Sequence, residues 1–129
     1  MTKLKILPRL IVSEPDRAAA YYRDSLGAEE VFRALGDDGR PTVVEHLLGS
    51  TSFRVSPAVS AWGWLSPHDL GGSPVLLEID VEDPDETGAR MTDHGAETVV
   101  PIENRDYGKR SGRIRDPFGH LWIVTGEPR

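Results

Sequence analysis

The sequence predicts an α+β fold of two βαβββ modules that form a curved sheet around a cleft. The main observation is an internal repeat. Val12–Asp16 opens a helical stretch that ends near Gly27, and Val81–Asp85 opens another that ends near Gly95. Similar strand patterns follow both helices, and repeated modules commonly hold small molecules between them. We expect one domain over residues 1–129, with a first module at 1–56, a connector at 57–73 and a second module at 74–129.

The first module reads as a strand, a helix and three strands. Residues 4–12 alternate in polarity as a strand does, and the acidic start and the glycine stop of the next segment are typical of a helix. The three strands that follow are expected at residues 28–34, 42–48 and 51–56.

The second module repeats this order. We expect a strand at 75–81, a helix at 85–94 and strands at 97–102, 112–115 and 120–125. A loop at 104–111 and a turn at 116–119 join these strands. Trp122 alternates with its neighbours and is predicted to lie in the core.

Composition excludes several classes of function. The net charge is −6, and no dense Lys/Arg cluster is present, so nucleic acid is not an expected partner. Without cysteine there is no disulfide, no Cys-ligated zinc and no thiol nucleophile. Pro8 and Arg9 interrupt the apolar N-terminal stretch, so we expect no signal peptide and no membrane span. These features predict a soluble, cytoplasmic protein.

Three segments carry a family resemblance: Tyr21–Gly27, Leu70–Val75 and Gly112–Trp122. Together with the repeat, they resemble the vicinal oxygen chelate superfamily, and most closely its glyoxalase/bleomycin-resistance proteins of the PhnB-like branch. The resemblance implies the fold of that family. It leaves the function open, because the family includes glyoxalases, dioxygenases, epimerases, fosfomycin-inactivating transferases and metal-free proteins that sequester antibiotics.

The resemblance also tests for a metal site. Metal-dependent members of the family hold a divalent ion through His and Glu on inner strands, and the matching positions here are Leu7, Arg54, Leu76 and Ile123. None of these side chains is a metal ligand of the kind required. We therefore expect no metal and no cofactor.

The same alignment predicts which side chains line the cleft. Alternate residues of a strand face the same side of the sheet, so Arg9 faces the same side as Leu7. Glu78 and Asp80 likewise face the same side as Leu76. Arg9 either clamps a ligand carboxylate or phosphate, or neutralises one of the two acids. Glu78 and Asp80 either share a proton as a general base or are simply solvated. Glu45 and His46 point to opposite faces, so only one of them lines the cleft.

Aromatic side chains complete the candidate site. Trp62 and Trp64 in the connector either stack on a planar ligand or cover the junction between modules. Tyr107 lies in a loop expected to act as a flap. The predicted ligand-binding residues are Leu7, Arg9, Glu45, Arg54, Trp62, Trp64, Leu76, Glu78, Asp80, Tyr107, Leu121 and Ile123.

The leading hypothesis is a metal-independent homodimer that binds and sequesters an antibiotic or secondary metabolite, for example a planar or aromatic one. One alternative is an enzyme of the same fold, a lyase, isomerase or dioxygenase. Such an enzyme would hold its metal through relocated donors (Glu45, His68, Glu78 or His120), or would work metal-free with Glu78 or Asp80 as base and Arg9 steadying an oxyanion. Another alternative is an accessory domain without a ligand.

Overall fold

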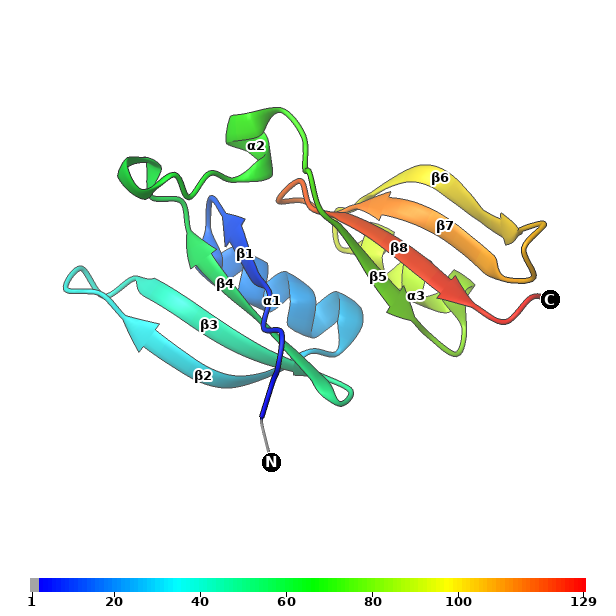
Figure 1. Cartoon of the computed structure of the whole chain (residues 1–129), viewed down its shortest axis with the longest axis horizontal. Coiled ribbons are helices and arrows are strands. Elements are labelled where there is room, and N and C mark those ends of the chain that lie inside the picture. The colour runs from blue at the N-terminus through cyan, green and yellow to red at the C-terminus, as the bar shows by residue number, and fades with distance from the viewer. Residues whose placement is uncertain (1–2) are drawn as a thin grey trace.

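Two modules with the same order of elements make up the structure, a computed structural model that describes residues 3–129 (Figure 1). The first contains β1 (Arg9–Val12), α1 (Pro15–Leu26), β2 (Glu29–Leu35), β3 (Pro41–Leu48) and β4 (Thr51–Pro57). The second contains β5 (Leu76–Asp80), α3 (Pro84–Asp93), β6 (Glu97–Asn104), β7 (Arg110–Arg115) and β8 (Leu121–Gly126). The predicted α+β fold of two βαβββ modules is confirmed.

Each module forms its own four-stranded sheet, and the two sheets have equivalent strand orders. The orders are β1-β4-β3-β2 and β5-β8-β7-β6. In both sheets the strand before the helix pairs in parallel with the last strand of the module, and the other pairs are antiparallel. The internal repeat of the sequence is therefore a repeat of topology.

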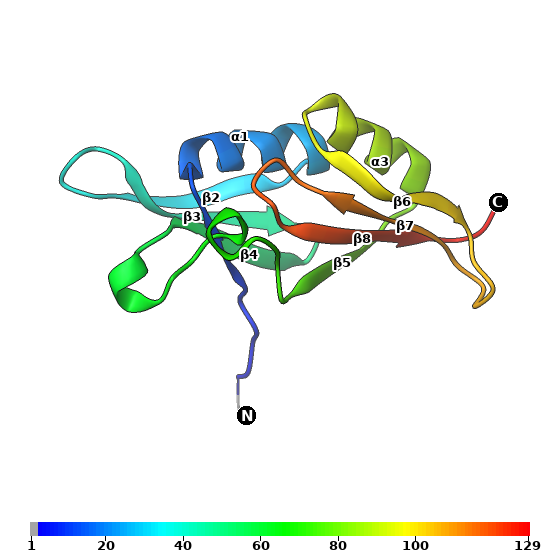
Figure 2. The same ribbon diagram turned by 90° about the horizontal axis from the view of Figure 1, so that it is seen from above.

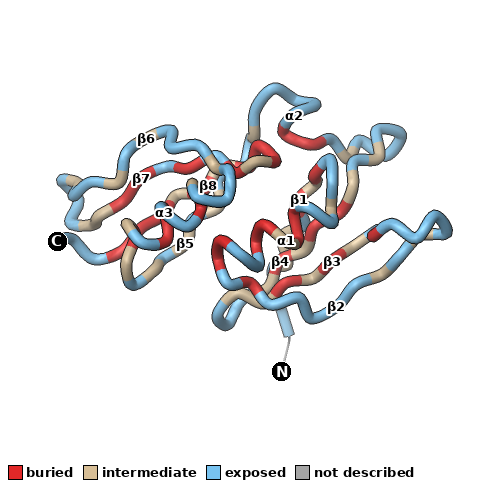
Figure 3. Tube along the Cα trace, turned by 180° about the vertical axis from the view of Figure 1, so that it is seen from behind, coloured by how far each residue is buried: buried red, intermediate tan, exposed pale blue. Residues whose placement is uncertain are grey.

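Both helices lie on the same side of the two sheets, next to each other (Figure 2). The core is formed between Tyr22 of α1 and Met91 of α3 and the helix-facing side chains of the strands, among them Val55, Ile114 and Val124. Figure 3 shows buried stretches in α1, β4, β7 and β8. The opposite side of each sheet is not covered by α1 or α3, and we call these two surfaces the first and the second open face.

The two helices begin with the same chemistry. Pro15 and Pro84 occupy the first turn of α1 and α3, where a missing N–H costs nothing. The Asp83 side chain accepts a hydrogen bond from the Glu86 N–H at 3.2 Å and so caps α3. Gly27 ends α1 at a φ of 72°, a left-handed conformation that glycine adopts without strain.

The first strand is shorter than predicted. The expectation of a strand over residues 4–12 is wrong before Arg9, because β1 begins there. Pro8 has no N–H to donate, although its carbonyl still accepts from the Arg54 N–H at 2.8 Å. Upstream of it, Leu4 and Ile6 are 93% and 86% exposed. In the second module, β6 and β7 are longer than predicted, so the loop between them is confined to residues 105–109.

The connector contains two short helices that the sequence analysis did not predict, η1 (Ser60–Trp62) and α2 (Pro67–Leu70). Ser66 and Asp69 form a capping box at the start of α2. The Asp69 N–H donates to the Ser66 hydroxyl at 3.2 Å, and the Ser66 N–H donates to the Asp69 carboxylate at 3.1 Å. The connector therefore has a defined conformation.

Asp116, in the turn between β7 and β8, ties the two modules together. It is 3% exposed and accepts hydrogen bonds from the Tyr22 hydroxyl at 2.5 Å and from the Trp122 indole N–H at 2.9 Å. The prediction that Trp122 lies in the core is confirmed. Nearby, a ring nitrogen of His120 lies 2.9 Å from the Ile11 carbonyl oxygen, which makes a second link between the modules.

No helix formed by residues 3–129 combines the length and the apolar character needed to cross a lipid bilayer.

Candidate functional site

The two open faces carry equivalent rows of side chains. In the first sheet Arg9 pairs with Arg54, and Arg54 pairs with Glu45. Their chain neighbours Leu10, Val55 and Val44 are buried towards α1, so the row lies on the first open face. In the second sheet the repeat places Glu78, Ile123 and Arg113 in the corresponding row.

Charges in the first row are only partly paired. The Arg54 Nε donates to the Glu45 carboxylate at 2.8 Å, and both side chains are partly buried. Arg9 is exposed, and within residues 3–129 no carboxylate makes an ion pair with it. Its guanidinium carbon instead lies 5.7 Å from the centre of the Trp64 ring, within the range of a cation–π contact.

The tryptophans form a second contact beside this row. The rings of Trp62 and Trp64 meet edge to face, with centroids 5.1 Å apart. Trp64 is held by two backbone hydrogen bonds with Val59, at 2.9 and 3.1 Å, and Gly63 makes the turn between the rings at a φ of 74°. Trp62 remains 67% exposed, and neither ring belongs to the core cluster. The connector therefore presents aromatic surface beside Arg9.

The second open face contains a hollow of ≈ 280 Å³. The Tyr107 hydroxyl and the Ser111 hydroxyl are 2.6 Å apart, and the Arg105 Nε donates to the Ser111 carbonyl at 3.0 Å. These contacts fix the loop that precedes β7. The side chains around the hollow are Glu78, Val100, Arg105, Tyr107, Ser111, Gly112, Arg113, Ile123 and Thr125. Ser111 and Arg105 were not predicted as site residues. Their position beside the hollow depends on how this loop folds back on β7, which the sequence pattern does not show.

The predicted residues are divided between the two sheets. The structure brings Arg9, Trp62 and Trp64 together, pairs Glu45 with Arg54, and places Glu78, Tyr107 and Ile123 around one hollow. Leu7 precedes β1, whereas Leu76, Asp80 and Leu121 lie on β5 and β8. The alternative in which Arg9 neutralises Glu78 or Asp80 does not hold for the described residues, since neither acid makes an ion pair with it.

Hollows between the modules correspond to the predicted cleft. One of ≈ 240 Å³ lies between β1 and β5, and its wall is mainly apolar, with Leu10, Phe53, Leu77 and Trp122. Another, of ≈ 340 Å³, lies under the connector and includes Arg9, Ile11 and Leu65. Asp80 lines a third, of ≈ 450 Å³, near the end of α1.

The residues present do not fit a divalent metal ion. Glu45 is engaged by Arg54, and a ring nitrogen of His120 contacts the Ile11 carbonyl. His46 is fully buried against Phe53, and burial lowers the pKa of its imidazole. His68 lies on α2, with its ring beside Gly119 in the turn between β7 and β8. Across residues 3–129, no three His, Asp or Glu side chains are grouped closely enough to hold an ion.

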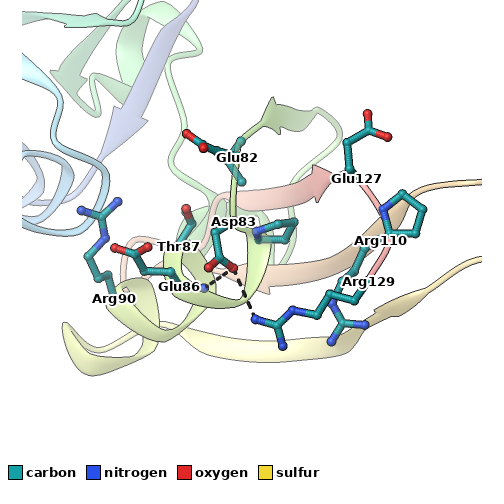
Figure 4. A pocket seen from close by; sticks show the side chains of 11 residues that line it. Glu82, Asp83, Glu86, Thr87, Arg90, Arg110, Glu127 and Arg129 are labelled. Carbon is teal, nitrogen blue, oxygen red and sulfur yellow. Dashed lines mark hydrogen bonds and ion pairs between the residues drawn. The ribbon is translucent and has the colours of Figure 1, made fainter.

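The largest hollow that we describe, of ≈ 770 Å³, lies between the start of α3 and the C-terminal residues (Figure 4). Two of the arginines that line it, Arg110 and Arg129, are paired with acids at the start of α3. Arg110 forms two hydrogen bonds with the Asp85 carboxylate, at 2.7 and 2.9 Å, and lowers the pKa of that group. Arg129 lies 3.8 Å from Asp83 and 3.6 Å from Asp85. No sequence pattern pointed to this hollow, and the ion pairs of Arg129 hold the C-terminal residue against the start of α3.

Comparison with other proteins gives a family and several relatives in sequence. A sequence model of the Glyoxalase/Bleomycin resistance protein/Dioxygenase superfamily matches residues 6–124. Uncharacterized proteins of Mycobacterium bovis and Mycobacterium tuberculosis are 32% identical over 126 residues. These alignments cover 94% of this chain, 81% of the M. bovis protein and 72% of the M. tuberculosis protein.

Solved structures share the fold. A gene product of Arabidopsis thaliana is 26% identical with a TM-score of 0.76, and the match covers 98% of this chain and 99% of that one. TioX from Micromonospora sp. ML1 is 23% identical with a TM-score of 0.75, covering 97% and 99% of the two chains. The fosfomycin resistance protein FosX from Mesorhizobium loti is 16% identical with a TM-score of 0.71, covering 98% and 93%.

Proposed function

Since the chain belongs to the glyoxalase/bleomycin resistance protein/dioxygenase superfamily, we propose that it binds a planar small molecule, an antibiotic or secondary metabolite, without a metal ion. Binding of this kind serves sequestration. The motifs at Tyr21–Gly27 and Gly112–Trp122 support a place in the PhnB-like branch of that superfamily.

The observation that carries the proposal is the contact of Trp62, Trp64 and Arg9. Aromatic rings provide a large flat surface that stacks on planar molecules, and their preferred geometries select for shape. The exposed ring of Trp62 costs free energy in water, since most of its apolar surface stays hydrated. A planar ligand that covers this ring removes that cost.

Metal independence rests on donor chemistry. A divalent ion of this type needs about three or four imidazole or carboxylate donors. The positions that match the metal ligands of the family hold Leu7, Leu76, Ile123 and Arg54. Of these, Arg54 is a cation that forms an ion pair with Glu45. Of the relocated donors, His120 contacts the Ile11 carbonyl, and neither His68 nor Glu78 belongs to a group of three His, Asp or Glu side chains among residues 3–129.

We also propose that the protein is a homodimer. Leu4 and Ile6 expose large apolar side chains, and so do Val31, Phe32 and Leu35 on the edge strand β2. A second copy can cover such surfaces.

Tryptophan fluorescence tests the proposed binding. Chelator-treated protein is titrated with antibiotics that carry a planar ring system, including mitomycin C and bleomycin, and free N-acetyltryptophanamide corrects for light absorbed by the compounds. We expect saturable quenching. In the double variant Trp62→Phe/Trp64→Phe, the buried Trp122 is the remaining tryptophan, and the saturable signal should disappear. Absence of quenching across a broad panel of planar compounds would contradict the proposal.

A second candidate function, metal-free acid–base catalysis, is favoured by one observation. Glu78 shares the hollow of the second open face with Tyr107 and Arg113, which gives an acid, a hydroxyl and a cation in one place. An enzyme of this kind consumes its ligand. Compounds recovered unchanged after long incubation with the protein support sequestration, whereas a chemically altered compound supports catalysis, provided that Glu78→Gln abolishes the change.

A further inference from the structure

We infer that the site beside Arg9 selects planar aromatic monoanions, with an aromatic carboxylate as the simplest example. This inference rests on the proposed function and names the class of ligand. It concerns the first open face and the connector, and it depends on the charges of the row formed by Arg9, Arg54 and Glu45.

The row contains two cations and one anion. Arg9 and Arg54 pair directly across parallel strands, so their side chains project from the same face of the sheet as neighbours. Like charges directly opposite each other repel. Glu45 binds Arg54 at 2.8 Å, which leaves the charge of Arg9 without an opposite charge among the described residues. One negative charge from a ligand restores the balance.

The repeated module provides an internal comparison. The positions that correspond to Arg9, Arg54 and Glu45 in the second sheet are Glu78, Ile123 and Arg113. That row has one acid and one base and is neutral. The excess positive charge is therefore a property of this row in the first sheet, and it stands out in a chain whose net charge is −6.

The aromatic part of the ligand follows from the position of the guanidinium. Arg9 lies 5.7 Å above the Trp64 ring, and stacking leaves the N–H groups at the edge of the guanidinium free to bind a carboxylate. Trp62 meets Trp64 at 77° and keeps 67% of its surface exposed. A flat ligand with an acidic group at its edge can contact Trp62 and reach Arg9 at the same time.

Two probes of the same shape separate charge from stacking. Naphthalene-2-carboxylate and the neutral naphthalene-2-carboxamide are titrated into the full chain by isothermal titration calorimetry at pH 7. We expect the carboxylate to bind about tenfold more tightly than the amide, because a charged partner strengthens hydrogen bonds from a guanidinium. Added salt should weaken binding of the carboxylate and leave binding of the amide nearly unchanged.

Variants assign the preference to Arg9. Arg9→Gln should give the two probes equal affinity. The matched control Arg17→Gln removes the same charge from α1, on the other side of the sheet, and should keep the preference. The salt dependence of binding to the unmodified chain also reports whether the charge of the ligand strengthens binding. This test remains if the variant folds poorly.

The outcomes separate the inference from the proposed function. Equal affinity of the two probes for the unmodified chain, or a preference that survives in Arg9→Gln, overturns the inference. If neutral planar compounds still quench Trp62 and Trp64 in that case, the protein binds planar ligands without selecting for charge. If neither probe binds and no planar compound quenches, the inference and the proposed function both fail.

Discussion

The Tyr22 hydroxyl donates a 2.5 Å hydrogen bond to the Asp116 carboxylate, and this bond joins α1 of the first module to the β7–β8 turn of the second. The same carboxylate accepts from the Trp122 indole and from the backbone N–H groups of Phe118 and His120. Burial and the charge of Asp116 raise the pKa of Tyr22 well above its ordinary value, so the phenol remains a donor. This contact is one of the links that join the two modules.

Replacement of Tyr22 by Phe should destabilise the protein by about 1.5–3 kcal/mol, the range for hydrogen bonds to charged groups. The ring and its packing are kept, so the loss reports the hydroxyl alone. Urea unfolding measures the change. Tyr107→Phe is the matched comparison, because its exposed phenol bonds the uncharged Ser111 hydroxyl, and its free energy of unfolding should fall by less, about 0.5–1 kcal/mol. Equal stability of Tyr22→Phe and the unmodified chain would contradict a stabilising link between modules.

His46 should make the protein less stable in mild acid. It is fully buried, stacks on Phe53 with ring centres 5.0 Å apart, and neither ring nitrogen has a hydrogen-bond partner among the described residues. Burial lowers its pKa in the folded state. Below about pH 6.5 the unfolded chain binds a proton that the folded chain does not, so stability is complete above that pH and falls as the pH decreases, by at most about 1.4 kcal/mol per pH unit.

Unfolding in urea between pH 7.5 and 5.5 measures this effect. His46→Phe keeps the aromatic contact and removes the titrating group, so its stability should depend less on pH than that of the unmodified chain. His94→Gln removes an exposed histidine and should keep the original dependence. If His46→Phe retains the full loss of stability in acid, the effect belongs to other groups.

Gly112 should not tolerate a side chain. A Cβ atom at this position would lie 2.7 Å from the Val100 carbonyl oxygen and 2.8 Å from the Ile102 nitrogen, both in the backbone of β6. The pairing of β6 with β7 is irregular there, between Val100 and Glu103. Gly112→Ala should therefore cost about 1–3 kcal/mol of stability. Gly72→Ala, in open space, is the control, and equal melting temperatures of the two variants would count against this reading.

Much of the fold could be predicted from the sequence because its signals are local. The Pro-Asp pairs at 15–16 and 84–85 and the glycines that follow marked both helices, and the repeat showed that the halves share one topology. The short helices of the connector were missed, although Ser66 and Asp69 carry a capping-box spacing. β1 was predicted too long because alternation continues past Pro8, whereas strand pairing does not.

The candidate site was less predictable because it depends on contacts between distant residues. Alternation correctly separates Glu45 from His46, since one pairs with Arg54 and the other is buried in the core. The contact of Arg9 with Trp64 depends on how the connector turns at Gly63, and the part played by Asp116 depends on how the modules pack. Neither of these contacts corresponds to a spacing or periodicity in the sequence.

Trp62 should contribute to binding and little to folding. Trp62→Leu should weaken the binding of planar compounds by about 2–10-fold, the equivalent of one aromatic contact. The free energy of unfolding should stay within about 0.5 kcal/mol, because the side chain is largely exposed. Equilibrium dialysis measures the affinity and urea unfolding the stability. Trp62→Phe should retain most of the affinity, and an unchanged affinity in Trp62→Leu would exclude stacking on this ring.

The claim that a planar molecule binds at the connector without a metal is tested most directly by nuclear magnetic resonance. The 3 tryptophans of a nitrogen-15-labelled, chelator-treated chain each give an indole N–H signal. On titration with a planar compound that quenches fluorescence, the signals of Trp62 and Trp64 should shift saturably, while that of Trp122, bonded to Asp116, should stay in place. Shifts that arise only after zinc, manganese or nickel is added, or connector signals that never move, would contradict this account.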